Sequence, residues 1–269
     1  MNLRSLGYRT DLFFVRFDGE VLDRGDYVVA RSPLNPTHYW GNFLLFERFP
    51  EPGEMHRWRE LFAAEVGTPP RTEHVNFAID LPNEEPEDLA ARLIPGFEVL
   101  RSLVLTSRLP CPPSAQESGA VVRVLTEAWE WEQAWENQVE CRDVVHELEG
   151  YRVFKRRQMD RYRRMTEAGL GAWFGAFVEG RLVGDLGIFT REGLGRFQAV
   201  GVHPDFRRRG ICRALLHHAS RYGFEELGAE ELVIVADPDY HAAPLYQSAG
   251  FAPAERLVAF TRWPRADEE

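Results

Sequence analysis

The sequence predicts an α/β protein of two parts, in which a complete α/β domain follows a shorter half of related pattern. Three observations predict this fold. A strand, a basic loop and a helix follow one another between residues 196 and 219. Short β-branched runs alternate with amphipathic segments from about residue 120 to 262. A weaker similarity relates residues 96–108 to residues 250–262.

The central strand and helix are defined by their spacing and their boundaries. Residues 196–202 lack a helical repeat and lie between Gly195 and Pro204, which suits a strand. After the loop, apolar residues recur with the spacing of one helix face, beginning at Ile211 and Leu215. The helix therefore begins directly after the loop.

The loop between them has the composition of an anion-binding site. Arg207, Arg208 and Arg209 precede Gly210, and a helix N-terminus presents unpaired N–H groups with roughly half a positive charge. A bulky side chain at Gly210 would block the close approach of a phosphate. The loop lacks the Lys-Ser/Thr pair of a P-loop, and it has one glycine where a dinucleotide fingerprint needs three. A pyrophosphate is the simplest ligand that it would bind.

This loop resembles the acyl-CoA-binding motif of the GNAT acyltransferase superfamily, Arg/Gln-x-x-Gly-x-Gly/Ala. The match places Arg207 first, Gly210 in the middle and Cys212 last. Cys212 departs from the smaller residue usual at that position, but its backbone N–H, the group that would hold the phosphate, is unaffected. An arginine-rich surface turn is the alternative interpretation of the same residues.

A second segment, residues 239–251, resembles the Asn-x-x-Ala-x-x-Leu-Tyr-x-x-x-Gly-Phe segment of the same superfamily, with Asp239 in the place of asparagine. The resemblance covers about residues 120–262 and implies a GNAT-type domain with a mixed sheet that binds acyl-CoA. It implies that Tyr246 is the catalytic residue. It also implies a set of cofactor-binding residues: Val200, Gly201, Val202, Arg207, Arg208, Arg209, Gly210, Ile211, Cys212, Arg213 and Asp239.

The other elements of this part follow in the order of a complete GNAT domain. A strand near residues 120–125 leads through Thr126, as the N-cap, into a helix that bears Trp131 and Trp135. These tryptophans, with Trp129, are predicted to pack rather than to contact a ligand. The remaining predicted elements are a helix at 151–166 and strands at 172–178, 182–189, 196–202, 231–236 and 251–262, with one helix on each side of the strand at 231–236.

The helix over residues 151–166 combines an apolar face with many basic side chains. Tyr151, Phe154, Tyr162 and Met165 can share the apolar face. Most of the basic side chains are predicted to form a solvated outer face. Because the first two helices border the acceptor site in the resembled fold, some could instead attract an acidic substrate or the 3′-phosphate of the nucleotide. The basic residues are Arg152, Lys155, Arg156, Arg157, Arg161, Arg163 and Arg164.

The N-terminal part carries a shorter series of elements. The predicted elements are strands at 27–30, 42–46 and 75–79 and helices at about 55–62 and 88–93. Residues 96–108 match residues 250–262 without a gap at glycine, phenylalanine, leucine, valine and arginine positions. We interpret this part as a shortened, degenerate GNAT-like copy. A chance match is the alternative.

If the N-terminal part is a copy, it has lost the chemistry. The loop before its helix carries Glu51 and Glu54 and no arginine, so it would repel a pyrophosphate. Arg92 stands where the other half has Tyr246. This part is then a scaffold, a dimer surface or a wall of the acceptor site. The proline-containing segment 111–118 is predicted to link domains at 1–110 and 119–269.

The composition predicts a cytoplasmic enzyme. The chain of 269 residues has no apolar run long enough to span a bilayer, and no apolar stretch at its start that would indicate a signal peptide. A net charge of −10 argues against nucleic acid or an anionic membrane as the main partner. Cys111, Cys141 and Cys212 are odd in number and widely separated, which disfavours a disulfide framework and a cysteine metal site. We expect no metal, and a homodimer is a further expectation.

The resemblance implies an N-acyltransferase that moves an acetyl or other acyl group from acyl-CoA to an amine by direct attack. Backbone groups of Val200, Gly201 and Val202 would hold the pantetheine arm and polarise the thioester carbonyl. Tyr246 would protonate the departing thiolate, because a phenol of pKa about 10 can donate a proton to a thiolate whose thiol has a pKa of about 8.5. The alternative role of Tyr246 is packing, with a hydrogen bond to the CoA sulfur.

The sequence singles out no general base for the amine proton. Many relatives carry a carboxylate on the strand before the phosphate loop, but this strand carries Gln198, which cannot accept the proton. Four other residues are chemically competent, namely Asp185, Glu147, Glu149 and His241. A non-catalytic acyl-CoA-binding regulatory module is therefore the alternative to an enzyme that acts on a small amine or a polypeptide amine.

Overall fold

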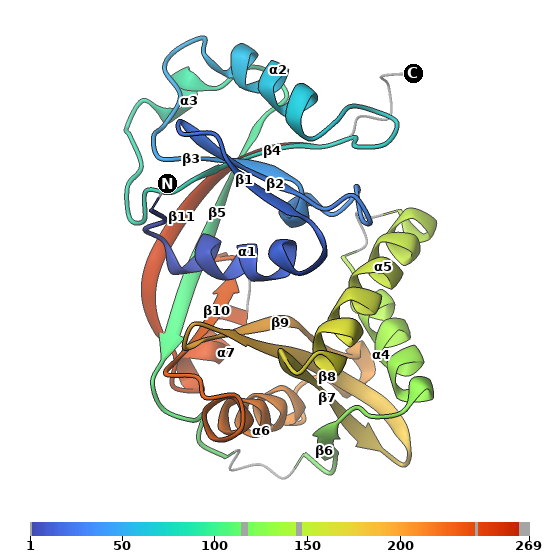
Figure 1. Ribbon diagram of the computed structural model, residues 1–269. Coiled ribbons are helices and arrows are strands. Elements are labelled where there is room, and N and C mark those ends of the chain that lie inside the picture. The colour runs from blue at the N-terminus through green and yellow to red at the C-terminus, as the bar shows by residue number, and fades with distance from the viewer. Residues whose placement is uncertain (1, 114–117, 144–146, 240–241, 264–269) are drawn as a thin grey trace. The chain divides into compact units, whose positions relative to one another are not determined.

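The computed structural model describes residues 2–113, 118–143, 147–239 and 242–263 (Figure 1). The chain forms two compact units. The first comprises Met1–Val104, Ala236–Tyr240 and Ala254–Glu269, and the second comprises Leu105–Val235 and His241–Pro253. Within the described ranges, every helix is too short or too polar to cross a membrane.

The first unit contains a mixed sheet with the strand order β1-β2-β3-β4-β11-β5. The pair β3–β4 is parallel, whereas β1–β2, β2–β3 and β4–β11 are antiparallel. Its elements are α1 (Leu6–Asp18), β1 (Glu20–Asp23), β2 (Tyr27–Arg31), the 3₁₀ helix η1 (Tyr39–Gly41), β3 (Phe43–Phe46), α2 (Met55–Glu65), β4 (Val75–Ile79), α3 (Leu89–Arg92), β5 (Glu98–Ser107) and β11 (Ala252–Arg262).

Helices α1 and α2 cover opposite faces of this sheet (Figure 1). On the α2 face, the Trp58 ring stacks on Phe46 with a centroid distance of 3.7 Å. On the α1 face, the Tyr8 hydroxyl donates a hydrogen bond of 3.0 Å to the Val258 carbonyl. Neither α1 nor β1 is among the elements predicted from sequence, although the Ser5 hydroxyl caps α1 by accepting the Tyr8 N–H at 3.3 Å.

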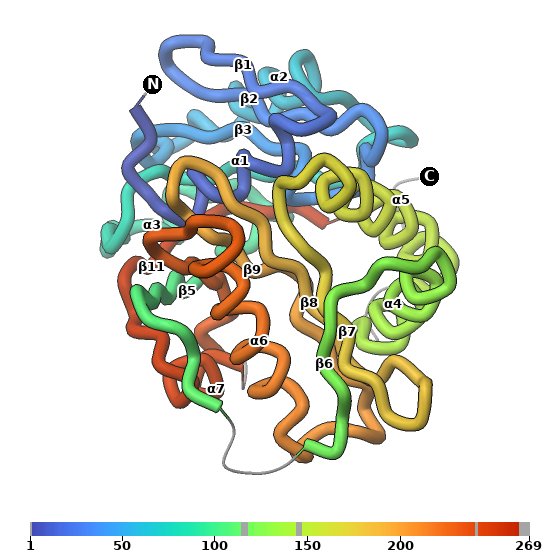
Figure 2. The backbone as a smooth tube through the Cα atoms, turned by 60° about the horizontal axis from the view of Figure 1, so that its bottom comes forward, coloured from blue at the N-terminus to red at the C-terminus, as the bar shows by residue number. Residues whose placement is uncertain are grey.

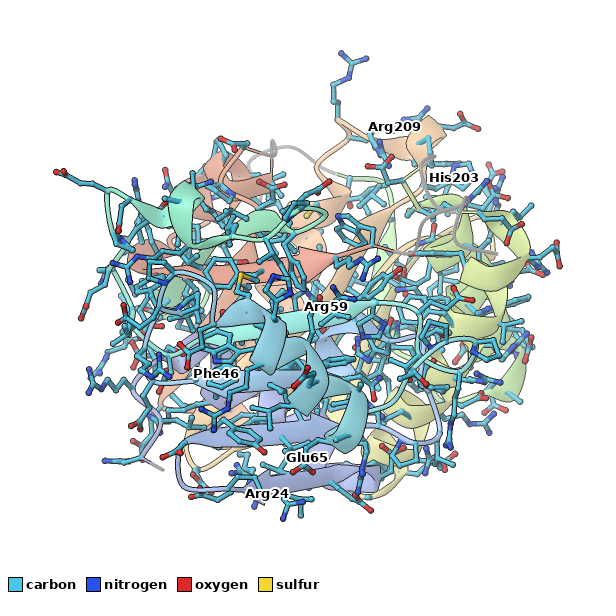
Figure 3. All side chains as sticks on the ribbon, turned by 90° about the horizontal axis from the view of Figure 1, so that it is seen from above. Arg24, Phe46, Arg59, Glu65, His203 and Arg209 are labelled. Atoms are coloured by element: carbon cyan, nitrogen blue, oxygen red, sulfur yellow. The ribbon has the colours of Figure 1, made fainter. Side chains whose placement is uncertain are left out.

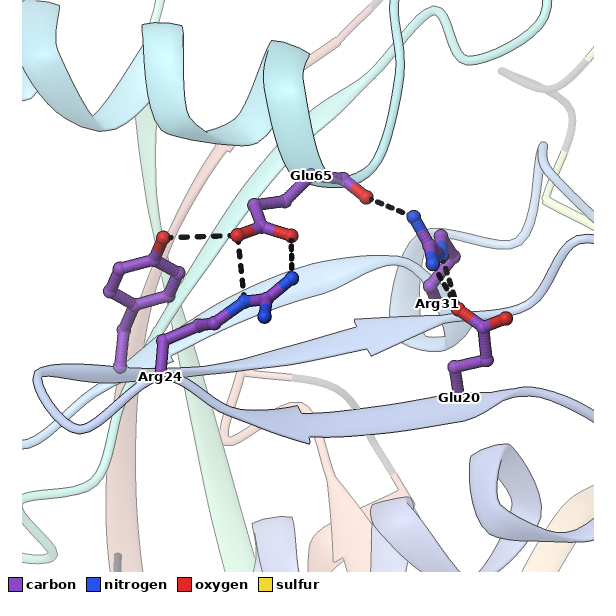
Figure 4. Close-up of polar contacts among 5 residues, drawn as sticks. Glu20, Arg24, Arg31 and Glu65 are labelled. Carbon is purple, nitrogen blue, oxygen red and sulfur yellow. Dashed lines mark hydrogen bonds and ion pairs between the residues drawn. The ribbon is translucent and has the colours of Figure 1, made fainter.

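Glu65 at the end of α2 holds the β1–β2 hairpin (Figure 4). Its carboxylate accepts two hydrogen bonds of 2.8 Å from the Arg24 guanidinium, and its carbonyl accepts one of 2.8 Å from Arg31. These groups are partly exposed, so they fix the position of the hairpin more than they add to stability.

The second unit contains a sheet with the strand order β10-β9-β8-β7-β6. The pair β9–β10 is parallel and the others are antiparallel, so the predicted α/β fold with a mixed sheet is confirmed. Its elements are β6 (Val121–Val124), α4 (Ala128–Glu140), α5 (Leu148–Glu167), β7 (Gly171–Val178), β8 (Arg181–Arg191), β9 (Leu194–Val202), the 3₁₀ helix η2 (Pro204–Phe206), α6 (Ile211–Glu225), β10 (Glu231–Ala236) and α7 (Ala242–Ser248).

Neighbouring residues of β8 show which helix covers which face of this sheet. A Cβ at Gly184 would meet Ile211 and Leu215 of α6 at 3.1 and 3.2 Å. The next residue, Asp185, faces the other way and bonds Asn137 of α4 at 2.6 Å. Helix α5 lies beside α4 (Figures 1 and 2), so α4 and α5 cover one face and α6 covers the other.

Two details near α4 differ from the sequence-based predictions. The N-cap is Glu127 rather than Thr126, because Glu127 and Glu130 form a reciprocal capping box. Trp131 and Trp135 are buried as predicted, but Trp129 is 49% exposed and lies edge-on to Phe177.

The last strand belongs to the sheet of the first unit. β11 pairs antiparallel with β4, from Val258 opposite Ile79 to Arg262 opposite Val75. This division differs from the predicted domains at 1–110 and 119–269, because strand pairing places the C-terminal segment with the N-terminal one. Of the predicted linker 111–118, residues 114–117 lie outside the described part. Cys111 is buried, and its N–H donates to the Ser220 hydroxyl of α6 at 2.9 Å.

The order of elements repeats along the chain. Apart from the 3₁₀ helices, the series from α1 to β5 has the same order as the series from α5 to β11: one helix, three strands, helix, strand, helix and strand. The two segments that match in sequence, 96–108 and 250–262, contain β5 and β11 at the ends of these series.

Candidate functional site

The parallel strands β9 and β10 pair over only part of their length. Their register runs from Leu194 opposite Glu231 to Arg196 opposite Val233. β9 continues to Val202 and β10 to Ala236. Beyond Arg196, the backbone N–H and C=O groups on this edge of β9 therefore do not pair with β10. Backbone groups of this kind can form hydrogen bonds with an extended ligand.

On its other edge, β9 contains a β-bulge. Asp185 of β8 pairs with Gly201 and Gly187 pairs with Gln198, so Ala199 and Val200 together oppose Leu186. Ala199 has a φ of 48°, in the left-handed region that alanine rarely adopts. Such a conformation costs about 1–3 kcal/mol and persists where its surroundings enforce it. The bulge lies directly before Gly201 and Val202, which were predicted to contact the cofactor.

The predicted basic loop connects β9 to α6. Gly210 is the N-cap of α6 with a φ of 76°, and Arg208 is also left-handed, with a φ of 61°. The first hydrogen bond of the helix runs from the Ala214 N–H to the Gly210 carbonyl at 3.0 Å. The N–H groups of residues 211–213 therefore have no acceptor within the helix. This is the geometry of an anion-binding helix N-terminus.

The arginine side chains of the loop have different surroundings. Arg207 is exposed, but its Nε donates to the Val202 carbonyl at 3.1 Å and its guanidinium contacts the Cys141 thiol. Arg209, labelled in Figure 3, donates to the Asp205 carbonyl at 3.0 Å, and its guanidinium lies 4.9 Å from the centroid of the Phe206 ring. The side chains of Arg208 and Arg209 are also exposed. Arg213 donates to the Ser248 carbonyl of α7 at 2.6 Å. Arg207 and Arg213 thus brace the loop and the two helices.

Tyr246 is buried in the same unit. Tyr246 belongs to α7, and its ring is edge-on to the Phe251 ring at a centroid distance of 6.5 Å. Phe251 is in turn 5.7 Å from Phe197 of β9. Asp239 is exposed, its N–H donates to the Asp237 carboxylate at 2.8 Å, and it falls in the segment grouped with the first unit. The second unit therefore holds the predicted residues from Val200 to Arg213 together with Tyr246, but not Asp239.

A buried polar cluster lies against β9 on the α4 face. Asp185 is fully buried and accepts three hydrogen bonds, from Asn137 at 2.6 Å, Gln138 at 3.0 Å and the Trp173 indole at 2.8 Å. A Cβ at Gly201 would lie 3.1 Å from Gln138 Nε2 and 3.6 Å from Asp185 Oδ1. Glycine at 201 thus leaves room for the cluster directly beside the strand.

Lys155 of α5 completes this cluster. Its Nζ donates to the Gln158 amide oxygen at 2.8 Å, and the Gln138 amide oxygen lies 3.5 Å away. Burial lowers the pKa of Lys155 to about 8, and burial raises the pKa of Asp185 to about 7. The predicted solvated outer face is therefore wrong for Lys155 and Arg161, both of which are buried. On the exposed side of α5, Arg156 forms two bonds of 2.7 Å with Glu132.

The candidate bases occupy different places. Asp185 lies inside the cluster with no exposed surface. The Glu147 carboxylate caps α5 by accepting the N–H groups of Glu149 and Gly150 at 2.8 and 2.6 Å. Glu149 is exposed, and His241 lies outside the described residues. Gln198 of β9 accepts a hydrogen bond of 3.2 Å from the Tyr162 hydroxyl.

Cavities and metal-binding groups add two observations. An open pocket of about 480 Å³ lies between α4 and the β7–β8 turn, lined among others by Asn137, Glu140, Arg181 and His203. Across the described ranges, no group of three or more His, Cys, Asp or Glu side chains is placed to hold a metal ion.

The buried carboxylate predicts a pH effect on stability. Asp185 must ionise in the folded protein near pH 7, but in the unfolded chain near pH 3.9. Because its folded pKa is raised, its contribution to stability is lost as the pH rises. We expect the free energy of unfolding of wild type to fall, relative to Asp185→Asn, between about pH 4 and about pH 7.

Denaturant titrations at several pH values measure this difference. The comparison with Asp185→Asn is needed because the lowered pKa of buried His74, about 4, acts in the opposite direction over part of the range. Parallel pH profiles of the two proteins would contradict the burial of an ionising Asp185.

Comparison with known proteins identifies the fold around this site. The profile of the Acetyltransferase (GNAT) family matches residues 128–251, which run from the start of α4 to Phe251 after α7. This domain belongs to the GNAT superfamily. The predicted resemblance is confirmed over these residues. A sequence comparison with curated proteins gave no match.

Solved structures resemble the chain beyond its GNAT domain. A functionally unknown conserved protein from Staphylococcus epidermidis has a TM-score of 0.69 at 13% identity, over 93% of this chain and 96% of that one. A GCN5-related N-acetyltransferase from Kribbella flavida has a TM-score of 0.64 at 16% identity, over 96% of each chain. A tandem GNAT protein from the clavulanic acid biosynthesis pathway has a TM-score of 0.54 at 15% identity, over 84% of this chain and 74% of that one. At these identities the likeness concerns the fold.

Proposed function

We propose that this protein is an N-acyltransferase that transfers an acetyl or other acyl group from acyl-CoA to an amine. One observation carries the proposal. In a GNAT domain, the bulged and partly unpaired strand β9 leads into the N-terminus of α6 through the left-handed Gly210. A strand edge that can bind an extended ligand is thus followed along the chain by an anion site. CoA needs both, because its pantetheine arm is joined to a pyrophosphate.

The cofactor would be held mainly by backbone groups. The N–H groups of Ile211, Cys212 and Arg213 would bind the pyrophosphate, with Gly210 permitting its close approach. The exposed side chains of Arg208 and Arg209 add positive charge at this loop. The backbone of residues 200–202 would align the pantetheine arm, and Asp239 stays a predicted contact.

The reaction needs alignment and proton transfer only, because the thioester is already activated. The amine nitrogen attacks the thioester carbonyl carbon to form a C–N bond. The C–S bond then breaks, and the thiolate takes a proton from the Tyr246 hydroxyl. The nitrogen releases one proton to solvent water, and the Tyr246 phenolate regains a proton from solvent. The buried ring of Tyr246, set against Phe251, supports a fixed position for this hydroxyl.

A panel of amines with a thiol-release assay tests the proposal. Small amines, polyamines and peptides with free amino groups are each supplied with acetyl-CoA, and release of CoA thiol above the rate of hydrolysis identifies the acceptor. Tight acetyl-CoA binding without turnover on any amine would favour the regulatory module. One observation favours that outcome. Gln198 of β9, which accepts a hydrogen bond from Tyr162, stands where a carboxylate could have served as the general base.

We also propose that the first unit descends from a second GNAT fold that no longer binds CoA. The repeated order of elements and the likeness to a tandem GNAT structure support this view. At the start of α2, the Glu54 carboxylate accepts the Glu51 N–H at 3.0 Å and pairs with Arg48 at 2.6 Å. The Glu54 carboxylate therefore already occupies a backbone N–H of this loop. Because Arg48 neutralises Glu54, the charge that would repel a phosphate is that of Glu51.

The chain should accordingly bind one acetyl-CoA. Isothermal titration calorimetry should give a stoichiometry of one per chain, and saturating ligand should raise the melting temperature, since it binds only the folded state. Gly210→Val, the variant of the α6 site, should weaken this single site, so that little binding heat remains at concentrations that saturate wild type. Two molecules per chain in wild type would contradict the loss of the first site.

A further inference from the structure

We propose that Gln138 of α4 is a positioning residue that aims the backbone N–H of Val200 at the thioester carbonyl. It does so by holding the preceding carbonyl group in the β9 bulge. This inference rests on the proposed function and concerns the same site. Asp185 and Lys155 are assigned the supporting role of fixing the orientation of the Gln138 amide.

Gln138 contacts the β9 bulge directly. Gln138 Nε2 donates a hydrogen bond of 2.6 Å to the Ala199 carbonyl. Ala199 is the left-handed residue of the bulge, so this bond meets the strand at its most strained peptide. Because a bulge leaves one residue outside the ladder, a side chain can hold a carbonyl that the neighbouring strand does not.

The neighbours of the Gln138 amide fix its orientation. The Gln138 Nε2 group also donates to Asp185 Oδ1 at 3.0 Å, and its oxygen lies 3.5 Å from Lys155 Nζ. An accepting oxygen of Asp185 beside the NH₂ group and the donor Nζ of Lys155 beside the oxygen admit one orientation of the amide and oppose the flipped one. Asp185 is fixed in turn by Asn137 and Trp173.

The planar peptide bond relates the direction of the Ala199 carbonyl to that of the Val200 N–H. The C=O and N–H groups of a trans peptide point in opposite directions. Since the Ala199 carbonyl points toward α4, the N–H of Val200 in the same peptide points away from α4, toward the face of the sheet that α6 covers. The α6 N-terminus is the proposed pyrophosphate site, so the Val200 N–H faces the side from which the cofactor approaches.

This arrangement assigns distinct tasks to the loop and the cluster. The loop holds the phosphates, whereas the Val200 N–H polarises the carbonyl on which the amine attacks. Gln138 itself touches neither cofactor nor amine. Its loss should therefore change the chemistry of the bound thioester much more than the affinity for CoA.

Infrared difference spectroscopy of bound acetyl-CoA labelled with ¹³C at the acetyl carbonyl tests this assignment. A donated hydrogen bond lowers the carbonyl stretching frequency, so wild type should show a lower frequency than free acetyl-CoA. In Gln138→Met, which keeps the length of the side chain without its amide, the frequency should return toward the free value. The single-turnover rate with the amine found by thiol release should fall about 10²-fold, the lower end of the loss for an oxyanion donor.

Two further variants separate positioning from general damage to the fold. Gln133 lies on the same helix, and its amide oxygen accepts a 2.7 Å hydrogen bond from the Leu182 N–H of β8. Gln133→Met removes this bond without touching the bulge, so the carbonyl frequency should stay unchanged. Adding Ala199→Gly to Gln138→Met should restore part of the frequency shift and part of the rate. Glycine adopts a left-handed φ without strain, so the bulge needs the Gln138 bond less.

The outcomes distinguish this inference from the proposed function. Failure of wild type to bind acetyl-CoA would overturn the proposed function. Normal binding with the same carbonyl frequency and rate in wild type and Gln138→Met would overturn the role of Gln138 alone. If Gln138→Met does not fold, Gln138→Asn, which is too short to span the 2.6 Å contact, gives the same test, and a wild-type frequency in that variant would contradict the proposal.

Discussion

Gly210→Val should lose about 100-fold or more in affinity for acetyl-CoA while the protein stays folded. Gly210 is the N-cap of α6 with a φ of 76°, a conformation that a β-branched residue adopts only at a cost of about 1–3 kcal/mol. The loop of the variant will relax from this conformation, and binding must then restore it. The valine methyl groups also stand beside the N–H groups of residues 211–213, which the pyrophosphate must approach.

Gly228→Val is the matched control for this variant. Gly228 follows the other end of α6 and is also left-handed, with a φ of 65°, but a Cβ there meets no heavy atom within 4 Å. Gly228→Val should lower the free energy of unfolding by about as much as Gly210→Val, through the same backbone strain, and should leave the affinity for acetyl-CoA unchanged. Calorimetry measures the affinities and thermal unfolding the stabilities. Equal affinities of Gly210→Val and Gly228→Val would remove the loop from the cofactor site.

The phosphate loop could be predicted from sequence because its chemistry is local. The spacing of apolar residues changes between β9 and α6, and this change marks where the strand ends and the helix begins. Gly210 stands directly before the first residue of that helix. Helix α1 was missed although Tyr8, Leu12 and Val15 have helical spacing and are buried. Gly7, Thr10 and the aromatic pair at 13–14 have low helix propensity, which obscures that pattern.

The buried cluster could not be predicted because its members meet only in the fold. Asp185 was recognised as a competent base, but its partners Gln138, Trp173 and Lys155 come from three other elements. One signal was available: Lys155 stands four residues after Tyr151 and seven before Tyr162, on the apolar side of α5. A charge at such a position must find a polar partner inside the protein.

The sheet to which the last strand belongs was equally hidden from the sequence. The similarity of residues 96–108 and 250–262 indicates that β5 and β11 are related, but not in which sheet each lies. A strand is assigned to a sheet by its hydrogen-bonded neighbours, and β11 pairs with β4 of the first unit. Boundaries drawn along the chain therefore differ from those drawn by contacts.

Tyr246→Phe should lower the single-turnover rate of acyl transfer by about 10²–10⁴-fold, the usual contribution of general acid catalysis. The ring is buried and rests against Phe251, which in turn lies against Phe197 of β9. Phenylalanine keeps these contacts and removes only the hydroxyl, so the melting temperature and the affinity for acetyl-CoA should change little. The steady-state rate is a weaker measure, because product release can limit it and hide part of the loss.

Tyr222→Phe is the control for loss of a phenol elsewhere in the unit. Tyr222 lies on α6 with its ring edge-on to Phe174 at 5.5 Å, and its hydroxyl has no part in the proposed reaction. Rapid-quench measurements should give a wild-type rate for Tyr222→Phe and the reduced rate for Tyr246→Phe. If the hydroxyl protonates the thiolate, an acyl donor with a more acidic thiol will depend on it less, so the loss should shrink with such a donor. A loss that is the same for both donors would indicate that Tyr246 positions the cofactor sulfur and that water supplies the proton.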